Sequence, residues 1–144
     1  MSNDRCCSSE IEVLFASNDN LTVMRWFDFL KYEGSGPQYV SFRFELKTPT
    51  FMVKTKFDSD IREIIRFKNE LKHTRGNRLI KFRPLGEYLL VNIETEGVNR
   101  IIVSGDISDM QMPQSSLSFS FEINNEMVIS LTNGLETVCK YLSL

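Results

Sequence analysis

The chain has 144 residues, 42% of them hydrophobic and 25% charged, and its formal net charge at pH 7 is −2. This size and composition are typical of one globular domain. No stretch reaches the roughly 18 apolar residues of a membrane-spanning helix, and residues 1–10 lack the hydrophobic core of a signal peptide. We therefore expect a cytoplasmic protein that does not associate with membranes.

Residues 1–9 are polar and are predicted to form a disordered N-terminal tail, followed by a single α+β domain over residues 10–144. The odd number of cysteines favours a reducing compartment over a disulfide framework. Cys139 falls on an apolar helical stripe and is expected in the core. Cys6 and Cys7 are neighbours in the tail, where no second pair is present to complete a metal site.

Alternation of apolar and polar residues, the period of a half-buried strand, predicts four strands in the first half of the domain. They span residues 10–16, 21–30, 39–47 and 51–57. In the second strand, Met24, Trp26 and Leu30 share one parity, so we expect these three on one face. Thr48-Pro49 marks the turn of a hairpin between the last two strands, because proline fixes φ and has no backbone N–H.

A helix is predicted directly after this hairpin. Apolar residues recur at helical spacing and form one buried stripe, namely Ile61, Ile64, Phe67 and Leu71. Asp60 and Glu63 have the spacing of a capping box at the start of the helix. Gly76, preceded by several basic residues, is a natural stop.

The second half repeats the order of strands followed by a helix. Four strands are predicted at residues 78–83, 87–95, 100–108 and 116–123, and a closing helix at about 130–142. Short connections imply antiparallel pairing, so we expect an α+β fold of about eight mostly antiparallel strands, in two four-strand sets, with two covering helices. The core is expected to include Phe42, Phe44, Ile64, Phe119, Phe121 and Leu135.

The residues that usually carry catalysis are scarce. The single histidine, His73, lies in the basic end of the first helix and is expected to face solvent, so no Ser-His or Cys-His pair can be built without it. Glu94 and Glu96 share one strand face, where two solvated carboxylates are far commoner than a glycosidic pair. We therefore predict a protein that is not an enzyme and that has no catalytic residues, metal, cofactor or small-molecule substrate.

Charge is unevenly distributed along the chain. Residues 43–83 hold twelve Lys or Arg and five Asp or Glu, a net of +7, whereas residues 84–144 hold two and eight, a net of −6. The basic segment favours phosphate binding, although the pI of about 5.5 is low for a nucleic-acid-binding domain. The acidic half could instead steer a basic protein partner.

Several segments resemble the WapI-type immunity proteins of bacterial polymorphic, contact-dependent toxin systems. The resemblance lies in the order of the elements and in a Phe-rich strand at 40–46, a Phe-x-x-x-Leu helix segment (Phe67, Leu71), and the segments 86–91, 101–105 and 117–123. It implies an intracellular antidote that binds the toxic C-terminal domain of a sibling effector and blocks it. The family shares no catalytic residues, so the resemblance assigns none.

The leading hypothesis is therefore an immunity protein whose partner is a cognate toxin domain. The expected contact surface is acidic and comprises Glu94, Glu96, Asp106 and Asp109. If the toxin is acidic, the basic helix at 62–75 becomes the better candidate. The alternatives are a nucleic-acid-binding module that uses residues 43–83, and a non-catalytic adaptor subunit.

Overall fold

The computed structural model describes residues 11–32, 38–73, 76–97, 100–109 and 115–143. The predicted tail at residues 1–9, with Cys6 and Cys7, lies outside these ranges. Cys139 is buried, as the helical stripe predicts.

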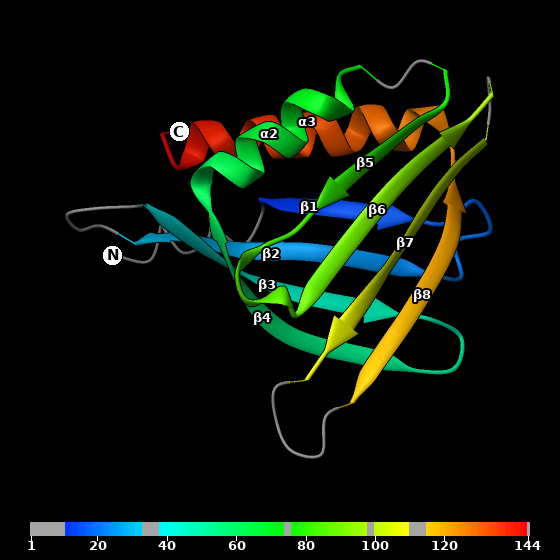
Figure 1. The fold of residues 1–144 in the computed structure, drawn as a ribbon, viewed down its shortest axis with the longest axis horizontal. Coiled ribbons are helices and arrows are strands. Elements are labelled where there is room, and N and C mark those ends of the chain that lie inside the picture. Colours follow the sequence, from blue (N-terminus) through cyan, green and yellow to red (C-terminus); the bar gives the residue numbers. More distant parts are fainter. Residues whose placement is uncertain (1–10, 33–37, 74–75, 98–99, 110–114, 144) are drawn as a thin grey trace.

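The described residues form two four-stranded antiparallel sheets and two α-helices, which confirms the predicted α+β fold (Figure 1). Sheet A consists, in spatial order, of β1 (Glu12–Ala16), β2 (Val23–Tyr32), β3 (Tyr39–Lys47) and β4 (Met52–Asp60). Sheet B consists of β5 (Arg78–Phe82), β6 (Leu89–Glu96), β7 (Arg100–Ser108) and β8 (Ser116–Ile123). The helices are α2 (Ile61–Leu71), which follows β4 directly, and α3 (Asn125–Tyr141), which follows β8. A short 3₁₀ turn, η1 (Leu85–Glu87), precedes β6.

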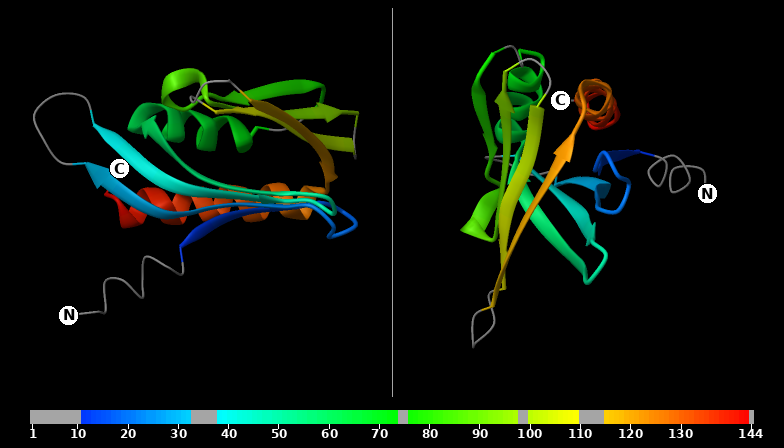
Figure 2. Two further views of the ribbon diagram at one scale, coloured as in Figure 1. Left: turned by 90° about the horizontal axis from the view of Figure 1, so that it is seen from below. Right: turned by 90° about the vertical axis from the view of Figure 1, so that its right-hand side faces the viewer.

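The two sheets form separate layers, and the helices lie along one edge of them (Figure 2). Helix α3 packs against β1, whereas α2 packs against β5, and the two helices contact each other. The opposite edge strands of the two sheets, β4 and β8, have no neighbouring strand on their outer side within the described residues. One edge of the arrangement is thus covered by helices, and the other is open.

Aromatic packing joins the two sheets and α2 into one core. The ring of Trp26 on β2 lies 4.8 Å from the ring of Phe82 on β5 and 5.9 Å from that of Phe67 on α2. These three side chains are almost completely buried. All six residues predicted for the core, Phe42, Phe44, Ile64, Phe119, Phe121 and Leu135, are buried as well. The many phenylalanines of the sequence therefore fill the space between the layers.

The alternation predicted for the second strand is wrong beyond Phe27. Asp28 has a φ of 53°, and the register with β3 shifts between Phe27 and Leu30. This bulge inverts the facing of the residues that follow it. Phe29 consequently joins Met24 and Trp26 in the core, whereas Leu30 is 58% exposed.

The two helix starts also differ from prediction. Asp60 caps α2 by accepting from the backbone N–H of Arg62, at 2.8 Å, but the expected capping box is incomplete because Glu63 does not reach back. Glu63 instead accepts from the backbone N–H of Arg83. Helix α3 begins at Asn125, not near residue 130, because the side chain of Asn124 accepts from the N–H of Met127.

Candidate partner-binding surfaces

The first candidate surface is the face of sheet B that points away from sheet A, here called the sheet B face. Successive side chains of a strand point to opposite faces of the sheet, so every second residue of β5 to β8 lies on this outer face and not in the core. Its centre is a shallow hollow of about 230 Å³ lined by Leu79, Lys81, Leu90, Asn92, Glu94, Ile102 and Ser104. Leu79 is 50% exposed, and Leu90 and Ile102 are partly exposed. No described helix or strand covers this group of aliphatic side chains.

Carboxylates surround the aliphatic centre. Glu94 lies opposite Leu79 on one side and Ile102 on the other, and no described cation lies within ion-pair distance of it. Arg100 pairs with two of these carboxylates: its guanidinium nitrogens lie 3.4 Å from a carboxylate oxygen of Glu96 and 3.0 Å from one of Glu122. The face is therefore apolar in the middle and predominantly acidic around it.

The predicted contact residues do not all come together. Glu94, Glu96 and Asp106 share the sheet B face, where Asp106 accepts a hydrogen bond of 2.5 Å from the hydroxyl of Ser118. Asp109 follows the end of β7 and lines a different hollow, described below. Its backbone N–H donates to the carbonyl of Ser115.

A buried polar group lies in the floor of this face. The amide oxygen of Asn92 is inaccessible to solvent and has no hydrogen-bond partner among the described residues. A buried acceptor without a partner costs about 1–3 kcal/mol.

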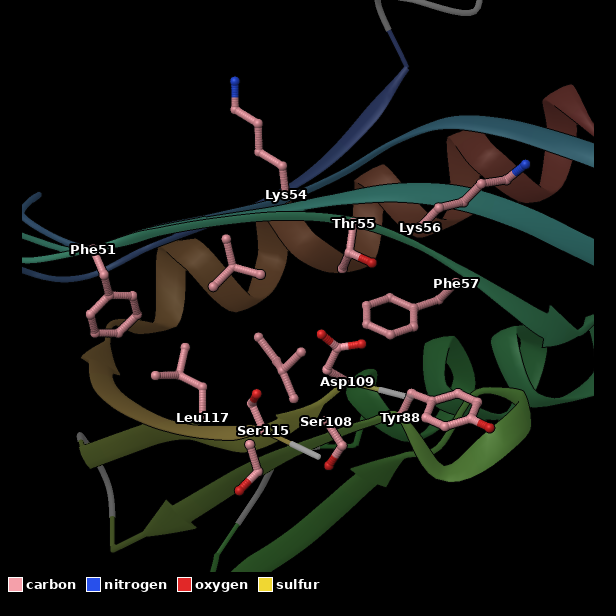
Figure 3. A pocket seen from close by; sticks show the side chains of 13 residues that line it. Phe51, Lys54, Thr55, Lys56, Phe57, Tyr88, Ser108, Asp109, Ser115 and Leu117 are labelled. Carbon is pink, nitrogen blue, oxygen red and sulfur yellow. The ribbon is translucent and has the colours of Figure 1, made fainter. Parts of the chain in front are cut away.

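The second candidate surface is a cleft of about 630 Å³ between β4 and the adjoining ends of β7 and β8 (Figure 3). Its apolar lining consists of Phe51, Val53, Phe57, Tyr88, Ile107 and Leu117. Figure 3 shows Phe51, Phe57 and Leu117 directed into the cleft, whereas Lys54 and Lys56 point away from it. The alternation of residues along β4 predicts which of its side chains face sheet B. It does not predict that sheet B fails to cover several of these side chains.

The basic segment at 43–83 does not form one continuous surface. Lys54 and Lys56 lie on the outer face of sheet A, whereas Lys81 lies on the sheet B face. Because the two sheets pack through their inner faces, these outer faces point in different directions. The segment's charge is therefore divided between them and helix α2.

Most cations of α2 are paired with neighbouring carboxylates. Arg66 pairs with Glu63 at 2.6 Å and also with Glu70. Arg62 pairs with Asp60 at 2.9 Å, and the hydrogen bonds donated by Arg62 lower the pKa of that carboxyl group. These pairs reduce the positive field that α2 presents to a phosphate.

Lys72, the residue that follows the end of α2, pairs with Glu136 of α3 at 2.5 Å. The hydrogen bond from Lys72, with the attraction of its charge, lowers the pKa of Glu136. His73 is exposed after the end of α2. No cluster of three or more His, Cys, Asp or Glu side chains suited to a metal ion occurs in the described part of the chain.

No helix among the described residues is long and apolar enough to cross a bilayer. No protein-family model matches the chain, and no curated protein or solved structure matches it.

Proposed function

We propose that this protein is a cytoplasmic immunity protein that binds the toxic C-terminal domain of a cognate bacterial effector and neutralises it by occlusion, without catalysis. The observation that carries the proposal is the sheet B face, a whole sheet surface with an uncovered aliphatic centre and an acidic surround. Exposed apolar groups bordered by polar residues are characteristic of protein-binding sites.

The chemistry of this face favours a basic partner. Glu94, Glu96, Asp106 and Glu122 outnumber the cations Lys81 and Arg100 on it. A negative field accelerates encounter with a positively charged protein, and a toxin that acts on nucleic acid would carry such a surface. The affinity itself would come from burial of Leu79, Leu90 and Ile102, because removal of apolar surface from water is the main favourable term in most protein–protein association.

Blocking a toxin requires a stable complex, with an interface of about 1,600 Å² in total and a slow dissociation rate. A four-stranded sheet offers a broad, rigid surface for such contact. The nucleic-acid alternative is less well supported, since the cations of residues 43–83 are split between faces and several are ion-paired. An adaptor subunit would use the same face with a partner that is not a toxin.

The test is co-expression with the toxin domain encoded by the reading frame immediately upstream. The wild-type protein should restore growth and co-purify with that domain. Leu79→Arg should weaken binding at least about 30-fold, as expected for the centre of an interface. Ile129→Arg is the matched control, because Ile129 is 61% exposed on α3 and does not line the hollow of the sheet B face.

Failure of the wild-type protein to protect or to co-purify, with the toxin domain active alone, would end the proposal. If the Leu79→Arg variant protects as well as the wild type, the proposed function stands, but the sheet B face is excluded as the contact surface. A stable complex with a non-toxic partner would favour the adaptor function.

A further inference from the structure

The cleft follows the unpaired edge of β4. Five consecutive residues from Val53 to Phe57 line it, although side chains of a strand point alternately to its two faces. A cavity lying over one face would contact every second residue. The side chains of Lys54 and Lys56 point away from the cleft, so these residues contact it through atoms at or close to the backbone of the strand.

Hydrogen bonds at the two ends of the β3–β4 pair show which backbone groups face this open edge. The N–H of Thr48 donates to the carbonyl of Phe51, at 2.9 Å, and the N–H of Ile61 donates to the carbonyl of Gln38, at 3.2 Å. In an antiparallel pair, residues bonded to the neighbouring strand alternate with residues whose N–H and C=O point outward. With the observed register, Val53, Thr55 and Phe57 bond to β3. Met52, Lys54 and Lys56 therefore direct their backbone N–H and C=O groups to the open edge.

Lys54 and Lys56 place two positive charges in the middle of β4. Two carboxylates also lie beside this edge, since Asp58 follows Phe57 on β4 and Asp109 lines the cleft. Neither Lys54 nor Lys56 has an ion pair among the described residues. Lys56 lies directly opposite Arg43, and like charges in that position repel. Glu45 lies opposite Lys54 but pairs with Arg25, at 3.5 Å. A carboxylate placed beside Lys54 or Lys56 would supply the missing counter-charge.

We propose that the open edge of β4 binds an extended segment of a partner protein in which apolar residues alternate with Asp or Glu. The segment adds as a fifth strand to sheet A and bonds to the backbone of Met52, Lys54 and Lys56. Its acidic side chains lie beside Lys54 and Lys56, on the outer face, because directly opposed residues share a face. Its apolar side chains enter the cleft and contact Phe51, Val53 and Leu117.

This mode of recognition obtains affinity from main-chain hydrogen bonds and specificity from alternate side chains. Lysines on an edge strand discourage pairing with other strands in general, so the same residues would select acidic segments and repel the rest. The site lies on sheet A and does not depend on the toxin-binding role of the sheet B face.

The test uses fluorescence anisotropy with a labelled, blocked peptide of sequence Val-Glu-Val-Glu-Val-Glu-Val and the full-length protein. There are two control peptides. In the first, every Glu is replaced by Lys; in the second, the same valines and glutamates are grouped in two separate blocks. We expect saturable binding of the alternating acidic peptide, and binding at least about tenfold weaker for both controls. N-methylation of the glutamates, whose backbone groups face β4, should abolish binding.

Variants of the protein distinguish this site from non-specific attraction. The double variant Lys54→Glu, Lys56→Glu should bind the acidic peptide at least about tenfold more weakly, whereas Lys81→Glu, on the sheet B face, should bind it normally. Leu79→Arg, which disrupts the proposed toxin site, should also bind the peptide normally. Far-ultraviolet circular dichroism and Trp26 fluorescence establish that each variant is folded.

Absence of binding at protein concentrations up to about 1 mM, where even a weak complex would form, would overturn the proposal, and the lysines would then serve only to prevent strand pairing. Equal binding of the alternating and block peptides would exclude strand addition, as would tolerance of N-methylation. Lys81→Glu changes the net charge by half as much as the double variant, so a loss of binding free energy about half as large would show that the peptide responds only to net charge.

Discussion

Gly105 provides a sharp test of the packing in sheet B. It lies in the middle of β7, opposite Phe119 of β8, and is not among the glycines with positive φ. Backbone conformation therefore gives no reason for glycine at this position. A Cβ atom here would lie 2.7 Å from Cζ of Phe119 and 3.1 Å from the carbonyl carbon of Leu90, and it would overlap the Leu90 carbonyl oxygen.

The expected effect of Gly105→Ala is the difference between two opposing terms. Replacing glycine in a strand normally stabilises by roughly 0.5–1 kcal/mol, because the unfolded chain loses conformational freedom. Overpacking typically costs about 1–3 kcal/mol, and displacement of the β6 backbone places this case towards the upper end. The net prediction is a loss of about 1–2 kcal/mol in the free energy of unfolding.

Urea denaturation followed by fluorescence measures this loss directly. Trp26 is the only tryptophan and is buried in the core, so its emission reports global unfolding. Ser104→Ala, at the adjacent outward-facing position, is the control and should leave the midpoint almost unchanged. A midpoint for Gly105→Ala that equals or exceeds that of the wild type would refute the close approach of β6, β7 and β8 at this point.

Three further outcomes are expected. Phe119→Ala should lower the free energy of unfolding by about 3–5 kcal/mol in the same assay, whereas Leu79→Ala, half-exposed on β5, should change it by less than about 0.5 kcal/mol. The pKa of Glu136 is lowered by Lys72, so the pair stabilises the fold above the ordinary glutamate pKa, and this contribution is lost as pH falls through the lowered value. Glu136→Gln should therefore lower the thermal midpoint at pH 7 and flatten its decline below about pH 4, and an unchanged acid profile would contradict the pairing. Burial raises the pKa of the Cys139 thiol, so iodoacetamide at pH 8 should modify it slowly in the native protein and quickly in urea, as followed by mass spectrometry of the Cys139 peptide.

Local patterns in the sequence correctly predicted the positions of most of the strands. The predicted spans at 39–47, 100–108 and 116–123 coincide with β3, β7 and β8. Apolar and polar residues alternate without interruption from Val40 to Lys47 and throughout β8, whereas in β7 the apolar Ile102 interrupts the pattern. The error in β2 arose from one residue. Alternation assumes an unbroken pleat, and the positive φ of Asp28 inserts a bulge that exchanges Phe29 and Leu30 between faces.

The candidate surfaces were less accessible to sequence reasoning. Glu94 and Glu96 share a face because they are two apart on one strand, and the antiparallel order of sheet B brings Asp106 to the same face. The cleft could not be predicted, because it depends on where the edge of one layer lies relative to the other. Such placement depends on packing between residues far apart in the sequence, such as Trp26 and Phe82, which no local pattern reveals.

The central claim is neutralisation by occlusion, and a titration of toxin activity tests it most directly. A fixed amount of the purified upstream toxin domain is mixed with increasing amounts of this protein, and the residual activity is measured. Occlusion predicts a linear decline that reaches zero near one equivalent, with no further change over time. Complete neutralisation by a small fraction of an equivalent would contradict the claim by showing turnover, and full activity in the presence of excess protein would contradict it by showing no binding.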